Sequence, residues 1–164
     1  LRYNAFVHRK INMIEELLSI NVKPGWKKGT KVTFPEKGNE QPGLIPADLI
    51  FVIDEKPHDV FKRDGNDLVV HKKISLADAL GGLTLSVPLL DGRTLSVPLV
   101  TEIIYPGFEK VISKEGMPIA KEHGKKGKLR IKFDVKFPSR LSVEQRSSIK
   151  KILNGNLNNN NADE

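Results

Sequence analysis

Residues Leu18–Asn39 read LSINVKPGWKKGTKVTFPEKGN, and this stretch decides the predicted fold. Apolar and polar residues alternate in Leu18–Val22 and again in Lys31–Phe34, and Pro24-Gly25 separates the two runs. Alternation with period two is typical of half-buried strands, because successive side chains point to opposite faces of a sheet. The stretch therefore predicts two strands joined by a turn, with Glu36–Asn39 closing the unit.

The same landmarks return in the same order farther along the chain. A short alternating run, a Pro-Gly turn, an apolar pair and a charged segment containing glycine recur at Leu95–Val97, Tyr105–Phe108, Val111-Ile112 and Lys114–Met117. Each copy is followed by a longer apolar strand, Asp48–Ile53 in the first and Lys128–Phe133 in the second. This recurrence predicts a duplicated β-module and two similar β-domains in tandem.

Turn residues divide the rest of the β-rich sequence. Residues 1–17 fit neither a helical nor a strand period cleanly, which predicts a loop or an irregular hairpin arm. Asn39–Gly43 and Glu55–Asp59 have the composition of a surface loop and a connector. Asp64-Gly65 and Asp91-Gly92 each favour a tight turn, because glycine readily adopts positive φ. The second pair separates two copies of Thr-Leu-Ser-Val-Pro-Leu and predicts a hairpin between them.

A short helix is predicted after Ser75, which begins a capping-box-like pattern with Asp78. Gly81-Gly82 ends this helix after about one and a half turns. A helix so short is not stable alone. We therefore expect it to pack on a sheet through Leu76, Ala79 and Leu80.

A second helix is predicted after Phe137-Pro138, where Ser142–Gln145 forms another capping box. Its apolar residues follow at near-helical spacing, and Asn154-Gly155 is its expected end. The apolar stripe requires a covering surface, which is either this chain's own sheet or a second copy of the chain. The Asn-rich residues Asn156–Glu164 are expected to be disordered.

Composition limits the partners. The net charge of +7 and pI near 9.6 suit an acidic partner, although the lysines are spread over many turns, where solvated positions are the commoner interpretation. The chain has no cysteine, which excludes disulfides, zinc-thiolate sites and thiol catalysis, and fits a reducing, cytoplasmic location. The longest uncharged run, Ala79–Leu90, is too short for a membrane-spanning helix.

No catalytic motif is found, so we predict that the protein is not an enzyme and uses no metal or cofactor. The histidines are scattered, without metal-ligand spacing, at His8, His58, His71 and His123. Two binding classes remain open. A nucleic-acid binder would use aromatic residues such as Trp26 and Phe34 on a basic face. A peptide binder would use an apolar strand such as Leu49–Ile53 and an exposed sheet edge.

Several segments resemble the C-terminal region of DnaJ-type co-chaperones. They are Val22–Phe34, Ile45–Leu49, Lys56–Leu68, Leu90–Thr94 and Glu115–Pro118. The resemblance covers residues 15–153, and the lack of cysteine resembles the class B subfamily, which has no zinc-finger region.

The resemblance implies a mainly β fold of two tandem β-sandwich-like domains, with a short helix in the second and a C-terminal helix that joins two chains into a homodimer. We expect a partial first domain at residues 1–56, a second domain at 57–138, a dimerisation helix at 139–153 and a disordered tail at 154–164. The first domain is expected to be truncated, because a further groove strand of the family would precede Leu1. The J domain, with its His-Pro-Asp signature, is not found; Pro57-His58-Asp59 has a different order.

The resemblance also implies binding of unfolded clients for delivery to the 70-kDa heat-shock chaperone, whose acidic Glu-Glu-Val-Asp tail enters the same apolar groove. Carried over by position, Phe51 matches a groove residue and Lys56 a tail-contacting lysine. Leu49 and Ile53 join Phe51 by strand alternation. The dimer interface is expected at Phe137, Leu141, Ile149, Ile152 and Leu153.

Overall fold

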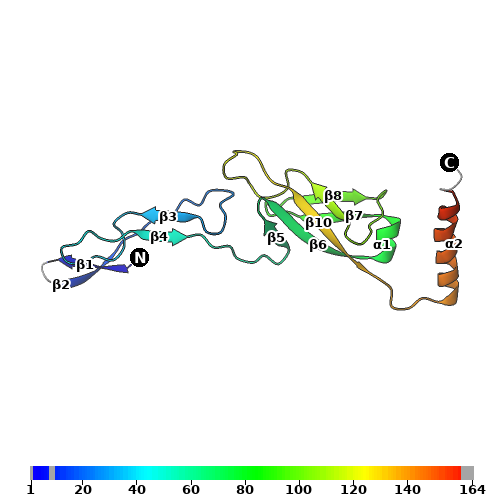
Figure 1. Cartoon of the computed structure of the whole chain (residues 1–164), viewed down its shortest axis with the longest axis horizontal. Coiled ribbons are helices and arrows are strands. Elements are labelled where there is room, and N and C mark those ends of the chain that lie inside the picture. The colour runs from blue at the N-terminus through cyan, green and yellow to red at the C-terminus, as the bar shows by residue number, and fades with distance from the viewer. Residues whose placement is uncertain (1, 8–9, 160–164) are drawn as a thin grey trace. The chain divides into compact units, whose positions relative to one another are not determined.

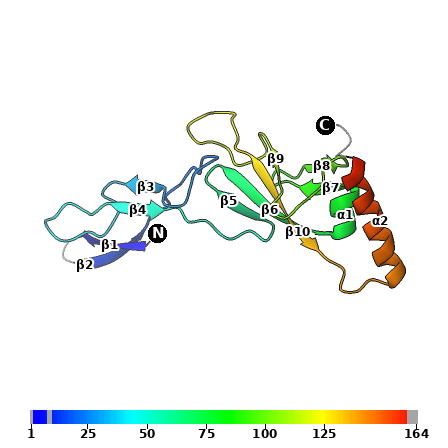
Figure 2. The ribbon, with the colours of Figure 1, turned by 45° about the vertical axis from the view of Figure 1, so that its right-hand side comes forward.

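The computed structural model describes residues 2–7 and 10–159 (Figure 1). These residues form a mainly β fold, which confirms the predicted fold class. The strands are β1 (Arg2–Val7), β2 (Lys10–Glu15), β3 (Lys31–Phe34), β4 (Leu49–Val52), β5 (Phe61–Asp64), β6 (Asp67–Ser75), β7 (Leu83–Pro88), β8 (Thr94–Leu99), β9 (Glu109–Ile112) and β10 (Leu129–Lys136). The helices are α1 (Leu76–Gly81) and α2 (Val143–Asn159). One sheet has the order β5-β6-β10-β9, and β1-β2, β3-β4 and β7-β8 form two-stranded sheets (Figure 2).

The chain divides into two compact units. The first unit contains residues 1–71 and 109–132, and the second contains residues 72–108 and 133–164. The buried apolar side chains of the first unit are Phe61, Leu68, Val69, Val70, Leu129 and Ile131. Those of the second unit are Ile74, Ala79, Val87, Val97, Leu99 and Ile104. Both units draw on segments far apart in sequence, and the boundary at residue 56 stays a prediction.

The duplicated module is visible in the strand pairing. β3 pairs with β4 and β9 pairs with β10, both antiparallel. The two pairs also have the same register, since Phe34 lies opposite Leu49 and Ile112 lies opposite Leu129. The two hairpins therefore place equivalent residues on equivalent faces.

The loops of the two modules match as closely as the strands. Two residues after each first strand, a non-glycine residue has positive φ, 55° at Glu36 and 65° at Lys114. A glycine two positions later donates its N–H across the loop, from Gly38 to Ala47 (2.7 Å) and from Gly116 to Gly127 (3.0 Å). These matched hydrogen bonds confirm the duplication predicted from sequence.

The predicted strand at Leu18–Val22 is wrong. Burial alternates over much of this segment, but it belongs to no strand in the described chain. Alternation determines which side chains face inward, whereas a strand also needs a neighbour that supplies hydrogen bonds. The first strands are instead the hairpin β1-β2, whose pairing is continuous from Arg2 opposite Glu15 to Val7 opposite Lys10. For residues 1–17 the sequence predicted a loop or an irregular hairpin arm; the described residues form a hairpin, and its pairing is regular.

Helix α1 has the predicted caps. The Ser75 hydroxyl accepts the Asp78 N–H (3.0 Å), and Gly82, with φ of 84°, donates its N–H to the Asp78 carbonyl (3.0 Å). Ala79 is fully buried, but Leu80 is exposed, so the expected packing of Leu80 is wrong. The Ala79 carbonyl accepts the Ile104 N–H (2.9 Å), which fixes the side of this short helix that faces inward.

The hairpin predicted from the repeated hexapeptide is confirmed as β7-β8. The two copies pair with each other, with Ser86 opposite Ser96. Gly92 has φ of 85°, as the Asp-Gly turn requires. Val87 and Val97 point into the core of the second unit, so the same repeated residue is buried on each strand.

Helix α2 begins at the predicted capping box. The Ser142 hydroxyl accepts the Gln145 N–H (3.2 Å), and the Gln145 side chain accepts the Ser142 N–H (2.9 Å). The helix continues through Gly155 to Asn159, so the expected end at Asn154-Gly155 is wrong, as is disorder at 156–159. An interior glycine costs about 1 kcal/mol, but a nucleated helix still gains one hydrogen bond for each residue added. The other tail positions, residues 160–164, lie outside the described chain.

Candidate functional site

The predicted groove residues share one face of β4. Leu49 and Phe51 are half-buried, as is Ile53 just beyond the strand, while Ile50 and Val52 between them are exposed. The paired strand β3 has the same division, since Val32 and Phe34 are half-buried and lie opposite Phe51 and Leu49. The Phe51 face of β3-β4 is thus an apolar surface that water still reaches.

An aromatic pair lies at the centre of this face. The rings of Phe34 and Phe51 meet edge to face, with centroids 5.7 Å apart. Such a pair stabilises its own geometry by about 0.5–1.5 kcal/mol beyond its buried area. The Phe51 ring is therefore held in place and also partly accessible.

The duplicated module shows what a fully covered version of this face looks like. Leu129 and Ile131 of β10 occupy the positions of Leu49 and Phe51, and both have an exposed fraction of 0%. β10 also has two neighbours, β6 and β9, whereas β4 in the described chain pairs only with β3. Among the described residues, the apolar face of β4 is thus less covered than that of β10, and β4 pairs with a strand on one side only.

The opposite face of β4 was not singled out by sequence reasoning. Ile50 and Val52 have exposed fractions of 52% and 58%. The available signal was the continuous apolar run from Leu49 to Ile53, since a strand with water on one face normally alternates. β4 therefore presents apolar side chains on both faces.

The predicted tail-contacting lysine lies just after this strand. Lys56 is exposed, and its ammonium forms no ion pair with a carboxylate of the described residues. Nearby, the Lys28 ammonium lies 2.9 Å from the Asp54 carboxylate. The hydrogen bond from Lys28 lowers the pKa of Asp54, and the same bond raises the pKa of Lys28. Both side chains are largely exposed, so this pair adds little to stability.

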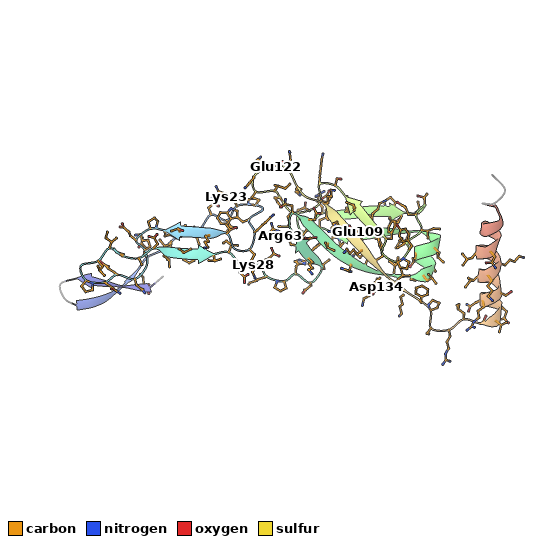
Figure 3. The ribbon with its side chains drawn as sticks, viewed as in Figure 1. Lys23, Lys28, Arg63, Glu109, Glu122 and Asp134 are labelled. Atoms are coloured by element: carbon orange, nitrogen blue, oxygen red, sulfur yellow. The ribbon has the colours of Figure 1, made fainter. Side chains whose placement is uncertain are left out.

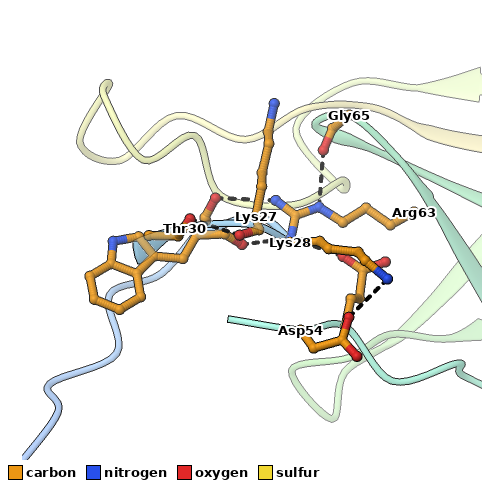
Figure 4. Close-up of polar contacts among 9 residues, drawn as sticks. Lys27, Lys28, Thr30, Asp54, Arg63 and Gly65 are labelled. Carbon is orange, nitrogen blue, oxygen red and sulfur yellow. Dashed lines mark hydrogen bonds and ion pairs between the residues drawn. The ribbon is translucent and has the colours of Figure 1, made fainter. Parts of the chain in front are cut away.

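Arg63 is the residue of this region that sequence reasoning missed (Figure 3). Its side chain is only 11% exposed. The guanidinium donates to the carbonyls of Trp26 (2.7 Å), Gly25 (3.1 Å) and Gly65 (3.0 Å), as Figure 4 shows. It also lies 3.4 Å from the Glu55 carboxylate. Arg63 thus joins the turn before β3, the segment after β4 and the β5-β6 turn.

A second arginine serves the four-stranded sheet. Arg130 of β10 contacts both carboxylate oxygens of Glu109 (2.6 and 3.2 Å) and the Asp64 carboxylate (3.0 Å). The hydrogen bonds from Arg130 lower the pKa of Glu109. These contacts join β5, β10 and β9 across the sheet, so we assign this cluster to structure.

The predicted dimer residues are accessible. Ile149, Ile152 and Leu153 share one face of α2 by helical spacing, and all three are exposed, with 66% for Ile152. Phe137 is also exposed, and Leu141 is half-buried. The described residues therefore leave this apolar stripe uncovered.

The described residues contain neither a candidate membrane span nor a candidate metal site. No helix there is both long and apolar enough to cross a bilayer. No cluster of three or more His, Asp or Glu side chains there has the geometry to hold a metal ion.

Comparison with known proteins gives a consistent result. The family model described as "DnaJ C terminal domain" matches residues 5–138. The chain is 44% identical over 139 residues to DnaJ protein homolog 1 of Drosophila melanogaster, covering 85% of this chain and 42% of that protein. It is 41% identical over 145 residues to human DnaJ homolog subfamily B member 5, and the match covers 88% of this chain and 41% of that protein. It is 39% identical over 131 residues to human DnaJ homolog subfamily A member 2, and the match covers 79% of this chain and 32% of that protein. The chain thus spans less than half the length of these relatives.

Proposed function

This chain belongs to the DnaJ C-terminal domain family, and from that premise we propose that it is the client-binding and dimerisation region of a co-chaperone. It binds unfolded polypeptide for delivery to a 70-kDa heat-shock chaperone, and it also contacts the acidic tail of that chaperone. The division into domains at 1–56 and 57–138 is part of the proposal. So is a cytoplasmic location, which suits a chain without cysteine.

The observation that carries the client proposal is the incomplete cover of β4. An extended peptide gains affinity from backbone hydrogen bonds along an open strand edge and specificity from apolar side chains on the adjoining face. Among the described residues, β4 offers both, with Phe51 as its largest side chain and Leu49 and Ile53 on the same side. Client chains differ in sequence but share a backbone and apolar residues, so this chemistry suits unfolded polypeptide.

Replacing Phe51 by alanine is expected to weaken binding of a labelled extended apolar peptide by about tenfold, because central aromatic anchors contribute more than about 1 kcal/mol. Fluorescence anisotropy measures the affinity. Ile50→Ala is the matched control, since Ile50 is the adjacent apolar residue on the opposite face of β4. If Ile50→Ala weakens binding and Phe51→Ala does not, the client surface lies on the other face.

The salt dependence of binding separates the two binding classes. A groove for apolar peptide should hold its affinity between low and moderate salt, whereas a nucleic-acid surface loses affinity steeply as salt rises. An oligonucleotide serves as the comparator in the same titration. Tight oligonucleotide binding with weak peptide binding would replace the client proposal with the nucleic-acid alternative.

The acidic tail is proposed to bind at Lys56. A tail with several carboxylates needs cationic groups that are accessible and not already paired, and Lys56 satisfies both conditions among the described residues. Its position shortly after β4 places it at one end of the proposed client surface. Tail and client would therefore meet on one module.

The dimer is proposed to form through α2 and the segment that precedes it. A two-fold interface uses the same patch on both chains, and the exposed stripe on α2, together with Phe137 and Leu141, supplies such a patch. Two client surfaces on one dimer would raise avidity for a long client, provided that the client spans both.

Deleting residues 142–164 is expected to convert a dimer to a monomer, because the deletion removes the apolar stripe. Light scattering measures the mass of both forms. Ile152→Ser should weaken the dimer in the same direction, whereas Lys151→Ser, at the adjacent exposed position, should not. Persistence of the dimer after the deletion would rule out α2 as the interface.

A further inference from the structure

The guanidinium of Arg63 donates most of its hydrogen bonds to backbone carbonyls, and only one contact among the described residues is to a carboxylate. Its bonds reach the carbonyls of Gly25, Trp26 and Gly65 at 2.7–3.1 Å, with the Glu55 carboxylate at 3.4 Å. Buried arginines usually pair with carboxylates, so a guanidinium aimed mainly at main-chain carbonyls fixes chain positions.

Two of the residues that Arg63 contacts are each followed directly by an exposed lysine. Trp26 precedes Lys27, and Glu55 precedes Lys56. Neither lysine ammonium forms an ion pair with a carboxylate of the described chain. Between them, Lys28 and Asp54 form a second link between the same two segments (Figure 4).

We infer that Arg63 is the positioning residue of the proposed acidic-tail site, because it fixes the two segments that carry Lys27 and Lys56. The inference rests on the proposed function and extends it, adding Lys27 to the site and naming the group that sets the spacing of the two lysines. Lysine side chains lose considerable rotamer entropy when a ligand fixes them. The fixed backbone leaves this side-chain cost unchanged, but it removes the further cost of ordering the two segments when the tail binds.

Arginine is required for this role because of its shape. The planar fork presents N–H groups in several directions, and Arg63 uses Nε, Nη1 and Nη2 at once. A lysine at the same position has one nitrogen and cannot reach three separated carbonyls. Arg63→Lys therefore keeps the net charge and removes the simultaneous hydrogen bonds to the three carbonyls.

The test uses a labelled peptide ending in Glu-Glu-Val-Asp with a free carboxylate, titrated by anisotropy. Arg63→Lys is expected to weaken tail binding about tenfold, the scale of one charge-assisted hydrogen bond. Binding of the apolar peptide should stay within about twofold, since the hydrogen bonds of Arg63 go to the Gly25, Trp26 and Gly65 carbonyls and not to the strands that carry Phe34 and Phe51. Lys62→Met, at the exposed neighbouring position of β5, removes one positive charge and leaves Arg63 in place, so it shows how far tail binding depends on net charge alone.

A double-mutant cycle with Lys56→Ala distinguishes positioning from general loosening. If Arg63 acts by placing Lys56, Arg63→Lys costs less tail affinity in the Lys56→Ala background than in the wild type. Additive losses would overturn the inference. No tail binding by the wild-type chain would instead contradict the proposed tail site itself, so the two failures are distinguishable.

Glu55→Gln provides an independent test if Arg63→Lys does not fold. Removing a negative charge beside Lys56 should strengthen binding of an acidic tail if charge alone matters. If Arg63 positions Lys56, Glu55→Gln should instead weaken tail binding, because the change removes the ion pair that holds the segment before Lys56. Tighter tail binding by Glu55→Gln would overturn the inference.

Discussion

Gly127→Ala is expected to lower the free energy of unfolding by about 3 kcal/mol or more, because there is no room for a methyl group. A Cβ on Gly127 would overlap the Asn66 carbonyl oxygen and lie 2.5 Å from the carbonyl carbon. Both obstacles are backbone, so no side-chain rotation relieves the contact. A small domain has only about 5–15 kcal/mol of stability, and this single methyl removes a large share of it.

The contact at Gly127 is tight because several hydrogen bonds converge there. The Asn66 carbonyl accepts the Met117 N–H (2.9 Å), and the Met117 carbonyl accepts the Gly127 N–H (2.9 Å). The Asp67 carboxylate accepts the Lys128 N–H (2.8 Å). The β5-β6 turn and the loop before β10 are thus bonded at successive residues, and neither can retreat without breaking these bonds.

Denaturant unfolding followed by circular dichroism measures the effect, with Gly81→Ala as the control. Gly81 lies in α1, lacks positive φ, and has no atom within 4 Å of the position that an added methyl would take. Alanine there should be neutral or stabilising by up to about 1 kcal/mol. Equal stability of the two variants would mean that the close approach at Asn66 does not exist in solution.

Leu129→Ala is expected to cost about 3–4 kcal/mol, whereas the same substitution at its repeat equivalent Leu49 should cost only about 1 kcal/mol. The residues occupy matching positions opposite Ile112 and Phe34, so chemistry and local geometry are the same. They differ in burial: Leu129 is fully buried, whereas Leu49 is half-buried. The cost of a truncated core side chain grows with the cavity that remains.

Thermal or denaturant unfolding of both variants measures this difference directly. A cost at Leu49 as large as that at Leu129 would show that the Phe51 face is covered in solution, either by the chain itself or by a second copy. That result would also remove the main support for a client surface on β4. The comparison therefore tests the fold and the proposed site together.

The sequence allowed prediction of elements whose signals are local. β3 follows from alternation between turn residues, and β4 follows from a continuous apolar run. The β7-β8 hairpin follows from a repeated hexapeptide around Asp91-Gly92, and both helix starts follow from their capping boxes. Each of these signals lies within a few residues of the element that it specifies. The comparisons confirm the family resemblance, and the proposed function rests on that resemblance rather than on any local signal.

The features that escaped prediction depend on distant partners. Leu18–Val22 alternates like a strand, but no neighbour in the described chain pairs with it. Arg63 reads as one charged residue of β5, and its main acceptors are backbone carbonyls 37 and 38 positions away. Since every residue has a backbone carbonyl, the sequence does not indicate which carbonyls accept these hydrogen bonds. Alternation likewise identified the residues that share a face with Phe51, but not how far that face is covered.

The bond from Lys128 to Asp67 joins residues 61 positions apart, and this separation affects how quickly the chain folds. The hairpin β7-β8, enclosed within that loop, requires only the short segment around Gly92 to turn. Ends of a long loop meet more slowly, and contacts of large sequence separation delay the folding transition state. We therefore expect β6 and β10 to pair after the hairpin has formed, and until then the edge of each strand that faces the other is unpaired. Unpaired strand edges favour aggregation, so we expect a partly folded chain to be exposed to it during this interval.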